Sequence, residues 1–445
     1  MNPNDNLGLF KQVPKELEKP IFDFLGLADG ENLSLVSKHF LEQGKKVTLT
    51  GIYLYHHGSI HKGSLPGARL LAGPFNDTDI EKRNARASSV KALEINGDWV
   101  ATDENLPKAL ALIARFKKLE YLAITDVKST SWTAAPDATK KAIAALCALP
   151  SLTTISLNSA PFRILEFCSP SVKNITLGRN LPLFFDNEVF NALSWQGSEK
   201  LAPETISISG GDLAALQRLV ALSKDAKINL GSVKNIEMDV QEASAWYLET
   251  VPELLNACSA SLETLAWEAF VDGEDPTQPK GLIDLSSFPK LNNLIVSFGR
   301  QFPKEGSIDP IVWVNNRLNT FANPQPSLKL VHLFVVVRSK FANYYHYHPK
   351  SGEWEEFDQI LSNKGRFPSL GKVRIDVKVP IIDDKPFGDN VKTGIKPFLH
   401  QLQAVNLLEE GEVNDEEREL LKKSPWGREL AFWAKKNTEL TFFFE

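Results

Sequence analysis

The chain of 445 residues carries a formal net charge of −5, and 43% of its residues are hydrophobic and 24% charged. This composition excludes a disordered chain, and the slightly acidic balance gives no overall attraction to nucleic acid or to anionic membranes. No secretory signal and no apolar run of membrane-spanning length is visible. The three cysteines lack metal-ligand spacing. We therefore expect a protein of the cytoplasm and/or the nucleus, with no nucleic-acid or membrane partner.

Residues 14–40 contain two short helical patterns separated by the glycine-containing break GLADG. Leu17, Ile21 and Leu25 share one helical face, and a second apolar face follows over residues 33–40. Pro14 suits the first position of a helix. A piece of about 40 residues buries too little surface to be stable alone, so this pattern predicts that the segment needs a partner surface.

The same stretch resembles an F-box, the segment by which receptors of ubiquitin ligases dock on a Skp-type adaptor. The family pattern reads P-x-E-L, then I-F-x-x-L, then L-x-L-V-S-K-x-F, and the chain follows it without an insertion. Pro20 and Gly30 depart from it. The resemblance implies an F-box at residues 8–45, and an alternative is a helical cap on the repeats that follow. The implied adaptor-binding residues are Pro14, Leu17, Ile21, Phe22, Leu25, Leu33, Leu35, Val36 and Ser37.

From residue 90 onward a six-residue pattern recurs in the order apolar, two residues, apolar, one residue, apolar. Successive copies start 20 to 42 residues apart, most of them close to 30. A proline or a small turn residue often precedes a copy, as it does before strands. We refer to each copy as a hexamer, and the ten hexamers begin at Val90, Leu119, Leu152, Val172, Pro203, Val233, Leu262, Leu291, Leu328 and Leu370.

Helical patterns lie between many of the hexamers. The sequence predicts helices within residues 105–116, 136–149, 210–223, 244–258 and 354–365, where apolar residues recur at helical spacing. Each unit therefore consists of a strand, a loop and a helix. A single unit cannot bury its apolar side, whereas stacked copies can, because neighbouring strands pair and neighbouring helices pack.

This arrangement resembles the leucine-rich repeat family, whose strand segment is L-x-x-L-x-L. The resemblance implies an α/β fold, an irregular solenoid of about ten repeats over residues 46–400 with parallel strands on the concave side and helices outside. The family's asparagine after the strand is matched only by Asn180, so we expect its ladder of buried amides to be missing. The alternative is an ordinary doubly wound α/β domain.

The C-terminal part contains longer connections between hexamers, and long loops often bind partners. Aromatic residues that commonly anchor interfaces occur here, and we take Tyr344, Tyr345, Tyr347 and Trp354 as candidate target-binding residues. Residues 401–445 read as helices followed by a strand, which predicts a cap on the last repeat.

An F-box followed by leucine-rich repeats implies a non-catalytic substrate receptor of a cullin-RING ubiquitin ligase. Its partners would be a Skp-type adaptor, a cullin and a target protein. A repeat scaffold without ligase function is the alternative. No pattern of catalytic residues occurs, and the histidines at 56, 57, 61, 346 and 348 favour exposed loops over a metal site. We expect no enzyme activity, no cofactor and no metal.

Overall fold

The computed structural model describes residues 51–54, 80–103, 105–127, 129–178, 200–208, 213–240, 245–269, 285–298, 310–321, 324–336, 351–379 and 440–442. Contacts divide the chain into two compact units, residues 1–201 and 202–445. Each unit is described by itself below.

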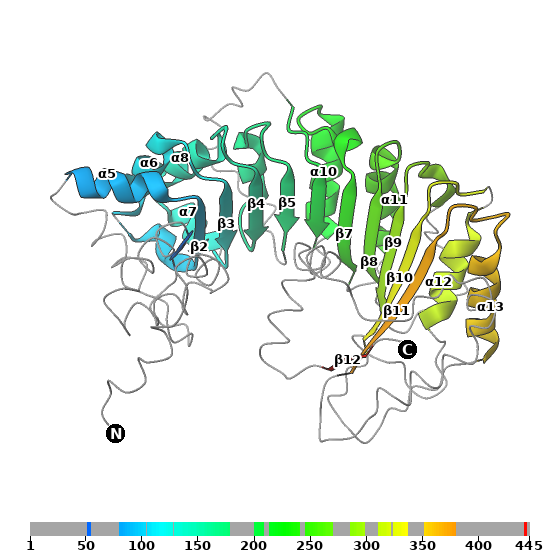
Figure 1. Ribbon diagram of the computed structural model, residues 1–445. Coiled ribbons are helices and arrows are strands. Elements are labelled where there is room, and N and C mark those ends of the chain that lie inside the picture. Colours follow the sequence, from blue (N-terminus) through cyan, green and yellow to red (C-terminus); the bar gives the residue numbers. More distant parts are fainter. Residues whose placement is uncertain are drawn as a thin grey trace, which may run out of the picture. The chain divides into compact units, whose positions relative to one another are not determined.

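The first unit contains a parallel sheet whose strands pair in chain order from β1 to β5 (Figure 1). Helices or 3-10 turns connect the described strands. The elements are β1 (Gly51–Leu54), α5 (Ile80–Ser89), β2 (Ala92–Asn96), η3 (Asp98–Ala101), α6 (Leu106–Phe116), β3 (Tyr121–Thr125), α7 (Ser129–Ala134), α8 (Asp137–Cys147), β4 (Thr154–Asn158), η4 (Phe162–Phe167) and β5 (Asn174–Leu177).

The second unit repeats this plan with parallel strands β6 to β11, again in chain order. Figure 1 shows helices α10 to α13 along one side of these strands. The short strand β12 pairs antiparallel with β11. The elements are β6 (Thr205–Ile208), α10 (Leu213–Lys224), η5 (Leu230–Ser232), β7 (Asn235–Val240), α11 (Ala245–Cys258), β8 (Thr264–Ala269), η6 (Leu285–Ser287), β9 (Asn293–Phe298), α12 (Pro310–Asn319), β10 (Leu330–Val336), α13 (Ser351–Ser362), β11 (Lys372–Val379) and β12 (Leu440–Phe442).

The strand order bears on the two α/β architectures considered from the sequence. A doubly wound sheet reverses its strand order at a switch point. Within each unit, the described parallel strands instead follow one another without a reversal. The α/β class is therefore confirmed, and this order is compatible with a solenoid of stacked strand-and-helix units.

All ten hexamers contribute a parallel strand, and their apolar positions are buried in the core. Leu93 lies beside Leu122, which lies beside Ile155 on the next strand, and all three side chains are fully buried. In the second unit Ile236, Leu265 and Leu294 form the equivalent row. The hydrophobic effect holds each strand in register, since a shift by one residue would turn these side chains to the other face.

The predicted helices are confirmed at all five places, and helix α6 illustrates why they form. It buries Leu106, Leu110 and Ile113 at helical spacing. The Oδ1 atom of Asp103 accepts hydrogen bonds from the backbone N–H groups of residues 105 and 106, at 2.8 and 3.2 Å, and so satisfies donors at the helix start. Helices α6 and α8 pack together, as do α10 with α11 and α12 with α13.

Several features differ from, or add to, the sequence-based expectations, among them helices α5, α7 and α12, which were not predicted. Strand β1 was not predicted, although LTGIYL from Leu49 fits the hexamer pattern. The predicted loop before Trp354 is shorter than expected because α13 begins at Ser351, and β11 continues to Val379 into the next predicted loop. The strand predicted near the C-terminus is confirmed as β12. The predicted segments 8–45 and 401–439 lie outside the described residues.

Candidate interaction surface

The turns that precede the strands form a continuous edge in each unit. The carbonyl oxygen of Lys234, at the second position of its hexamer, accepts two hydrogen bonds from the next repeat. The donors are the backbone N–H groups of Glu263 and Thr264, at 2.7 and 2.9 Å. The same two-donor pattern occurs at Lys91, Glu120, Thr153, Glu204, Glu263, Asn292 and Lys329. We call this row of turns the strand-start edge.

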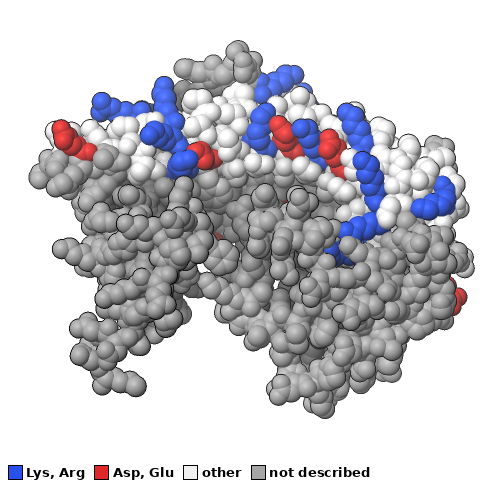
Figure 2. Space-filling model, in the orientation of Figure 1, with Lys and Arg blue, Asp and Glu red and all other residues white. Residues whose placement is uncertain are grey.

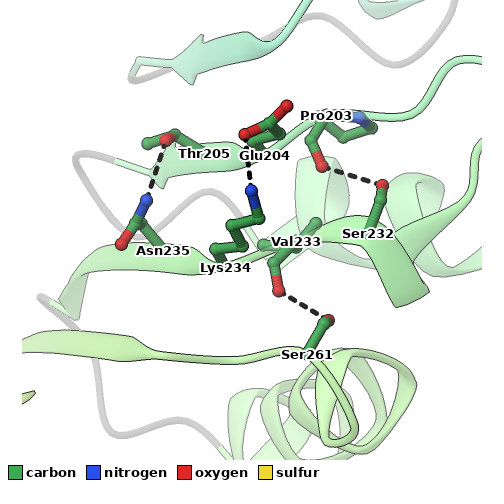
Figure 3. A network of polar contacts seen from close by, with 8 residues as sticks. All are labelled: Pro203, Glu204, Thr205, Ser232, Val233, Lys234, Asn235 and Ser261. Atoms are coloured by element: carbon green, nitrogen blue, oxygen red, sulfur yellow. Dashed lines mark hydrogen bonds and ion pairs between the residues drawn. The ribbon is translucent and has the colours of Figure 1, made fainter. Parts of the chain in front are cut away.

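Serine hydroxyls add a second set of bonds along this edge. The hydroxyl of Ser232 donates to the carbonyl of Pro203 at 2.9 Å, and the hydroxyl of Ser261 donates to the carbonyl of Val233 at 2.7 Å (Figure 3). Ser151 and Ser171 make equivalent bonds to Leu119 and Leu152 in the first unit. Each serine stands directly before a hexamer. These hydroxyls link each turn to the preceding repeat.

Replacing Ser261 by Ala tests the contribution of this serine row. We expect a loss of about 1 kcal/mol in the free energy of unfolding, because the partly buried carbonyl of Val233 loses a hydrogen-bond donor. Urea unfolding followed by circular dichroism measures the change. Ser259→Ala on the same turn is the control, and an equal effect of both substitutions would contradict a specific role of Ser261.

Charged side chains alternate in sign at the second hexamer position of several repeats. The ammonium group of Lys91 lies 2.8 Å from a carboxylate oxygen of Glu120, and that of Lys234 lies 3.0 Å from Glu204 (Figure 3). The hydrogen bond and the charge of Glu204 raise the pKa of Lys234, and the charge of Glu263 adds to the rise. Each of these exposed lysines therefore has an acidic neighbour on an adjacent turn.

This pairing of lysines with acidic neighbours ends at the turns before β9, β10 and β11. Lys329 occupies the second hexamer position of its repeat, but its neighbours at that position are Asn292 and Gly371. The described residues of these turns, 285–292, 324–329 and 363–371, include no acidic side chain, whereas they include Lys290 and Lys364 in addition to Lys329. Figure 2 shows Lys and Arg side chains gathered along the strand-start edge.

The strand positions that alternate with the buried ones form a polar face. Its side chains are largely Thr, Ser, Asn and Glu in the strands β2 to β8. Amide groups donate to hydroxyls of the preceding strand, from Asn235 to Thr205 at 3.3 Å and from Asn293 to Thr264 at 3.2 Å. In the described strands this face offers hydroxyl, amide and carboxylate groups for hydrogen bonding.

The candidate target-binding residues separate into two groups. Trp354 is fully buried in α13, and its ring packs edge to face against Phe357 with 5.8 Å between the ring centres. This position does not support direct target contact by Trp354, because apolar burial against α12 explains the residue. Tyr344, Tyr345 and Tyr347 lie outside the described residues, as do all nine candidate adaptor-binding residues between Pro14 and Ser37.

The described residues provide no centre for metal or thiol chemistry. Within them, no group of three His, Cys, Asp or Glu side chains lies close enough to hold a metal ion. All three cysteines are buried. Burial raises the pKa of the Cys258 thiol to about 12, which disfavours the reactive thiolate. The five histidines considered from the sequence lie outside the described ranges.

No helix in the described parts of the chain is long and apolar enough to cross a membrane. A scan against protein-family models and a search of curated proteins find no match to this sequence.

Proposed function

We propose that this chain is a non-catalytic substrate-recognition subunit of an SCF-type ubiquitin ligase. In this proposal, residues 8–45 act as an F-box that docks on a Skp-type adaptor, and the leucine-rich-repeat-like array binds a target protein. The adaptor would in turn be held by a cullin. The protein would act in the cytoplasm or the nucleus, without a cofactor.

The register of the parallel sheets is the observation that supports target binding. Repeats that align residue by residue place equivalent side chains in rows on the polar face and along the strand-start edge. Such extended rows form the binding surfaces of repeat proteins. The two-donor carbonyls and the serine hydroxyls connect successive turns. These bonds favour a rigid surface, and a rigid surface loses less conformational entropy on binding.

The function follows from positioning and requires no bond-making residue in this chain. A target held on a rigid array close to a ubiquitin-loaded enzyme reacts at a high effective concentration instead of by random encounter. The polar face carries hydroxyl, amide and carboxylate groups suited to recognition. The F-box-like pattern between Pro14 and Phe40 supports the adaptor half of the proposal.

A repeat scaffold without ligase function is the second candidate. Pro20 and Gly30 favour it, since they depart from the F-box pattern. Pro20 would remove a backbone hydrogen bond within the first predicted helix, and Gly30 would weaken the start of the second. In this case residues 8–45 would cover the end of the array and would not bind an adaptor.

Capture of a Skp-type adaptor distinguishes the two candidates. We expect the full-length chain to bind purified adaptor at micromolar concentration, measured by isothermal titration calorimetry with a chain lacking residues 8–45 as the control. If the full-length chain binds no adaptor at that concentration, the ligase proposal is wrong and the scaffold remains.

A further inference from the structure

We propose that the strand-start edge at the last three parallel strands binds an acidic polypeptide segment, rich in Asp and Glu. The residues that would contact it are Lys290, Lys329, Lys364 and Lys372, which we call the lysine edge. The inference rests on the proposed function in treating the repeat array as the target-binding part, and it adds the chemical character of the target.

Hydrogen bonds hold the three turns of the lysine edge next to one another. The carbonyl of Asn292 accepts from the N–H groups of Lys329 and Leu330 at 2.8 and 3.1 Å. The carbonyl of Lys329 accepts from those of Gly371 and Lys372 at 3.0 and 3.1 Å. Neighbouring turns are thus one strand spacing apart, about 4.8 Å. This spacing of the backbone turns is shorter than the screening length of about 8 Å at physiological salt, so lysines on neighbouring turns act on one anionic partner together.

Arg366 fixes the last of these turns without being needed for binding. Its guanidinium donates to the carbonyls of Asn319 and Phe321 at 2.8 and 2.9 Å, at the end of α12. Partial burial lowers the pKa of Arg366 below its ordinary value. The ammonium of Lys364 donates to the carbonyl of Leu370 at 2.9 Å across the same turn. The turn is therefore ordered before any partner binds, which lowers the entropic cost of binding.

The contrast with earlier repeats indicates that the positive charge is not required by the fold. Lys91 and Lys234 occupy equivalent positions but have Glu120 and Glu204 beside them. At Lys329 the two adjacent positions are Asn292 and Gly371, which leave the lysine uncompensated by these neighbours. Lys290, Lys329 and Lys364 are exposed, and Lys372 is half-buried. The edge thus presents positive charge to an anionic partner in a chain whose net charge is −5.

Restoring the acidic neighbours tests the inference directly. We expect Asn292→Glu with Gly371→Glu to weaken binding of a fluorescein-labelled peptide of twelve alternating Glu and Gly residues at least about tenfold, because each new carboxylate neutralises a lysine and repels the peptide. The fold has room at position 371, where an added Cβ atom would meet only the carbonyl oxygen of Lys329 at 4.0 Å. Fluorescence anisotropy with the full-length protein at about 50 mM and about 300 mM NaCl measures the affinity and its dependence on screening.

Two control variants test whether the loss of affinity depends on the position of the added charge. One controls for side-chain size and the other for the net charge of the protein. Asn292→Gln with Gly371→Ala changes the size of the same side chains without adding charge, and it should bind the peptide as the wild type does. Asn256→Glu with Gln359→Glu adds the same charge at exposed positions of α11 and α13 and should change affinity less than about twofold. Equal weakening by the two Glu pairs would overturn the assignment of the edge.

Two further probes, a Gln peptide and an oligonucleotide, test whether the partner is an acidic polypeptide. A matched peptide with Gln in place of Glu should bind at least about tenfold more weakly, and a twelve-nucleotide single strand should bind no better than the Glu peptide. Equal binding of the Gln peptide, or tighter binding of the oligonucleotide that also depends on the lysine edge, would overturn the proposal of an acidic polypeptide. Adaptor binding is measured separately, with the chain lacking residues 8–45 as its control. A chain that binds no adaptor contradicts the ligase proposal, whereas a chain that does not bind the Glu peptide contradicts the proposal for the lysine edge.

Discussion

Replacing Leu17, Ile21 and Val36 by Asp is expected to weaken adaptor binding by more than about a hundredfold. In the proposed F-box these side chains lie on the apolar faces that dock on the adaptor, and a carboxylate buried there without a partner costs several kcal/mol. Isothermal titration calorimetry measures the loss. The repeat array should remain folded, which amide hydrogen exchange of β7 to β9 can show.

A matched variant carries the same number of Asp residues at polar positions of the same segment. Lys15→Asp, Lys19→Asp and Lys45→Asp should bind the adaptor within about threefold of the wild type, because these lysines do not belong to the apolar faces of the sequence pattern. If the apolar and polar variants bind equally well, the apolar faces are not the docking surface. If the apolar variant also unfolds β7 to β9, residues 14–40 serve the array as a cap.

Replacing Trp354 by Ala is expected to destabilise the second unit by about 3–5 kcal/mol, because its removal leaves a cavity as well as losing apolar burial. The indole is fully buried in α13, which packs against α12. Urea unfolding followed by circular dichroism gives the loss in stability. Hydrogen exchange of residues 351–362 should rise because this helix loses its main anchor.

Glu355 provides the control for Trp354 on the same helix. It is exposed and should tolerate Ala within about 0.5 kcal/mol. An unchanged unfolding curve for Trp354→Ala would contradict its place in the core and return it to the candidates for target contact. The two tryptophan outcomes therefore separate a structural role from a binding role.

The parallel sheet could be predicted because its signal is repeated. Each hexamer places apolar residues at two strand positions and one preceding position, and Val90, Leu119 and Leu152 confirm that even the position before the strand is buried. Strand β1 was missed because it lies 41 residues before β2 in register, Gly51 opposite Ala92, and no helical pattern was recognised between them. The hexamer pattern of β1 was present in the sequence, but the long connection to β2 did not indicate a repeat.

The interaction surface was less predictable, because it depends on which side chains meet across repeats. Nothing in the local sequence distinguishes Lys329 from Lys234. Lys234 nevertheless lies 3.0 Å from Glu204, whereas the equivalent neighbours of Lys329 are Asn292 and Gly371. Serines before the hexamers were visible as turn residues, but their bonds to the preceding repeat require the register of the sheet. Trp354 was taken as a candidate target-binding residue at the first position of a predicted helix, whereas α13 begins at Ser351 and buries the indole.

Strand β12 bears on whether copies of this protein associate through the edge of their sheets at high concentration. A terminal parallel strand offers open backbone donors and acceptors, and such a strand can recruit the corresponding strand of another molecule into a growing fibre. Here residues 440–442 pair with Val377, Lys378 and Val379 of β11. Strand β12 therefore pairs with backbone groups of β11 that would otherwise be open to the corresponding strand of another copy.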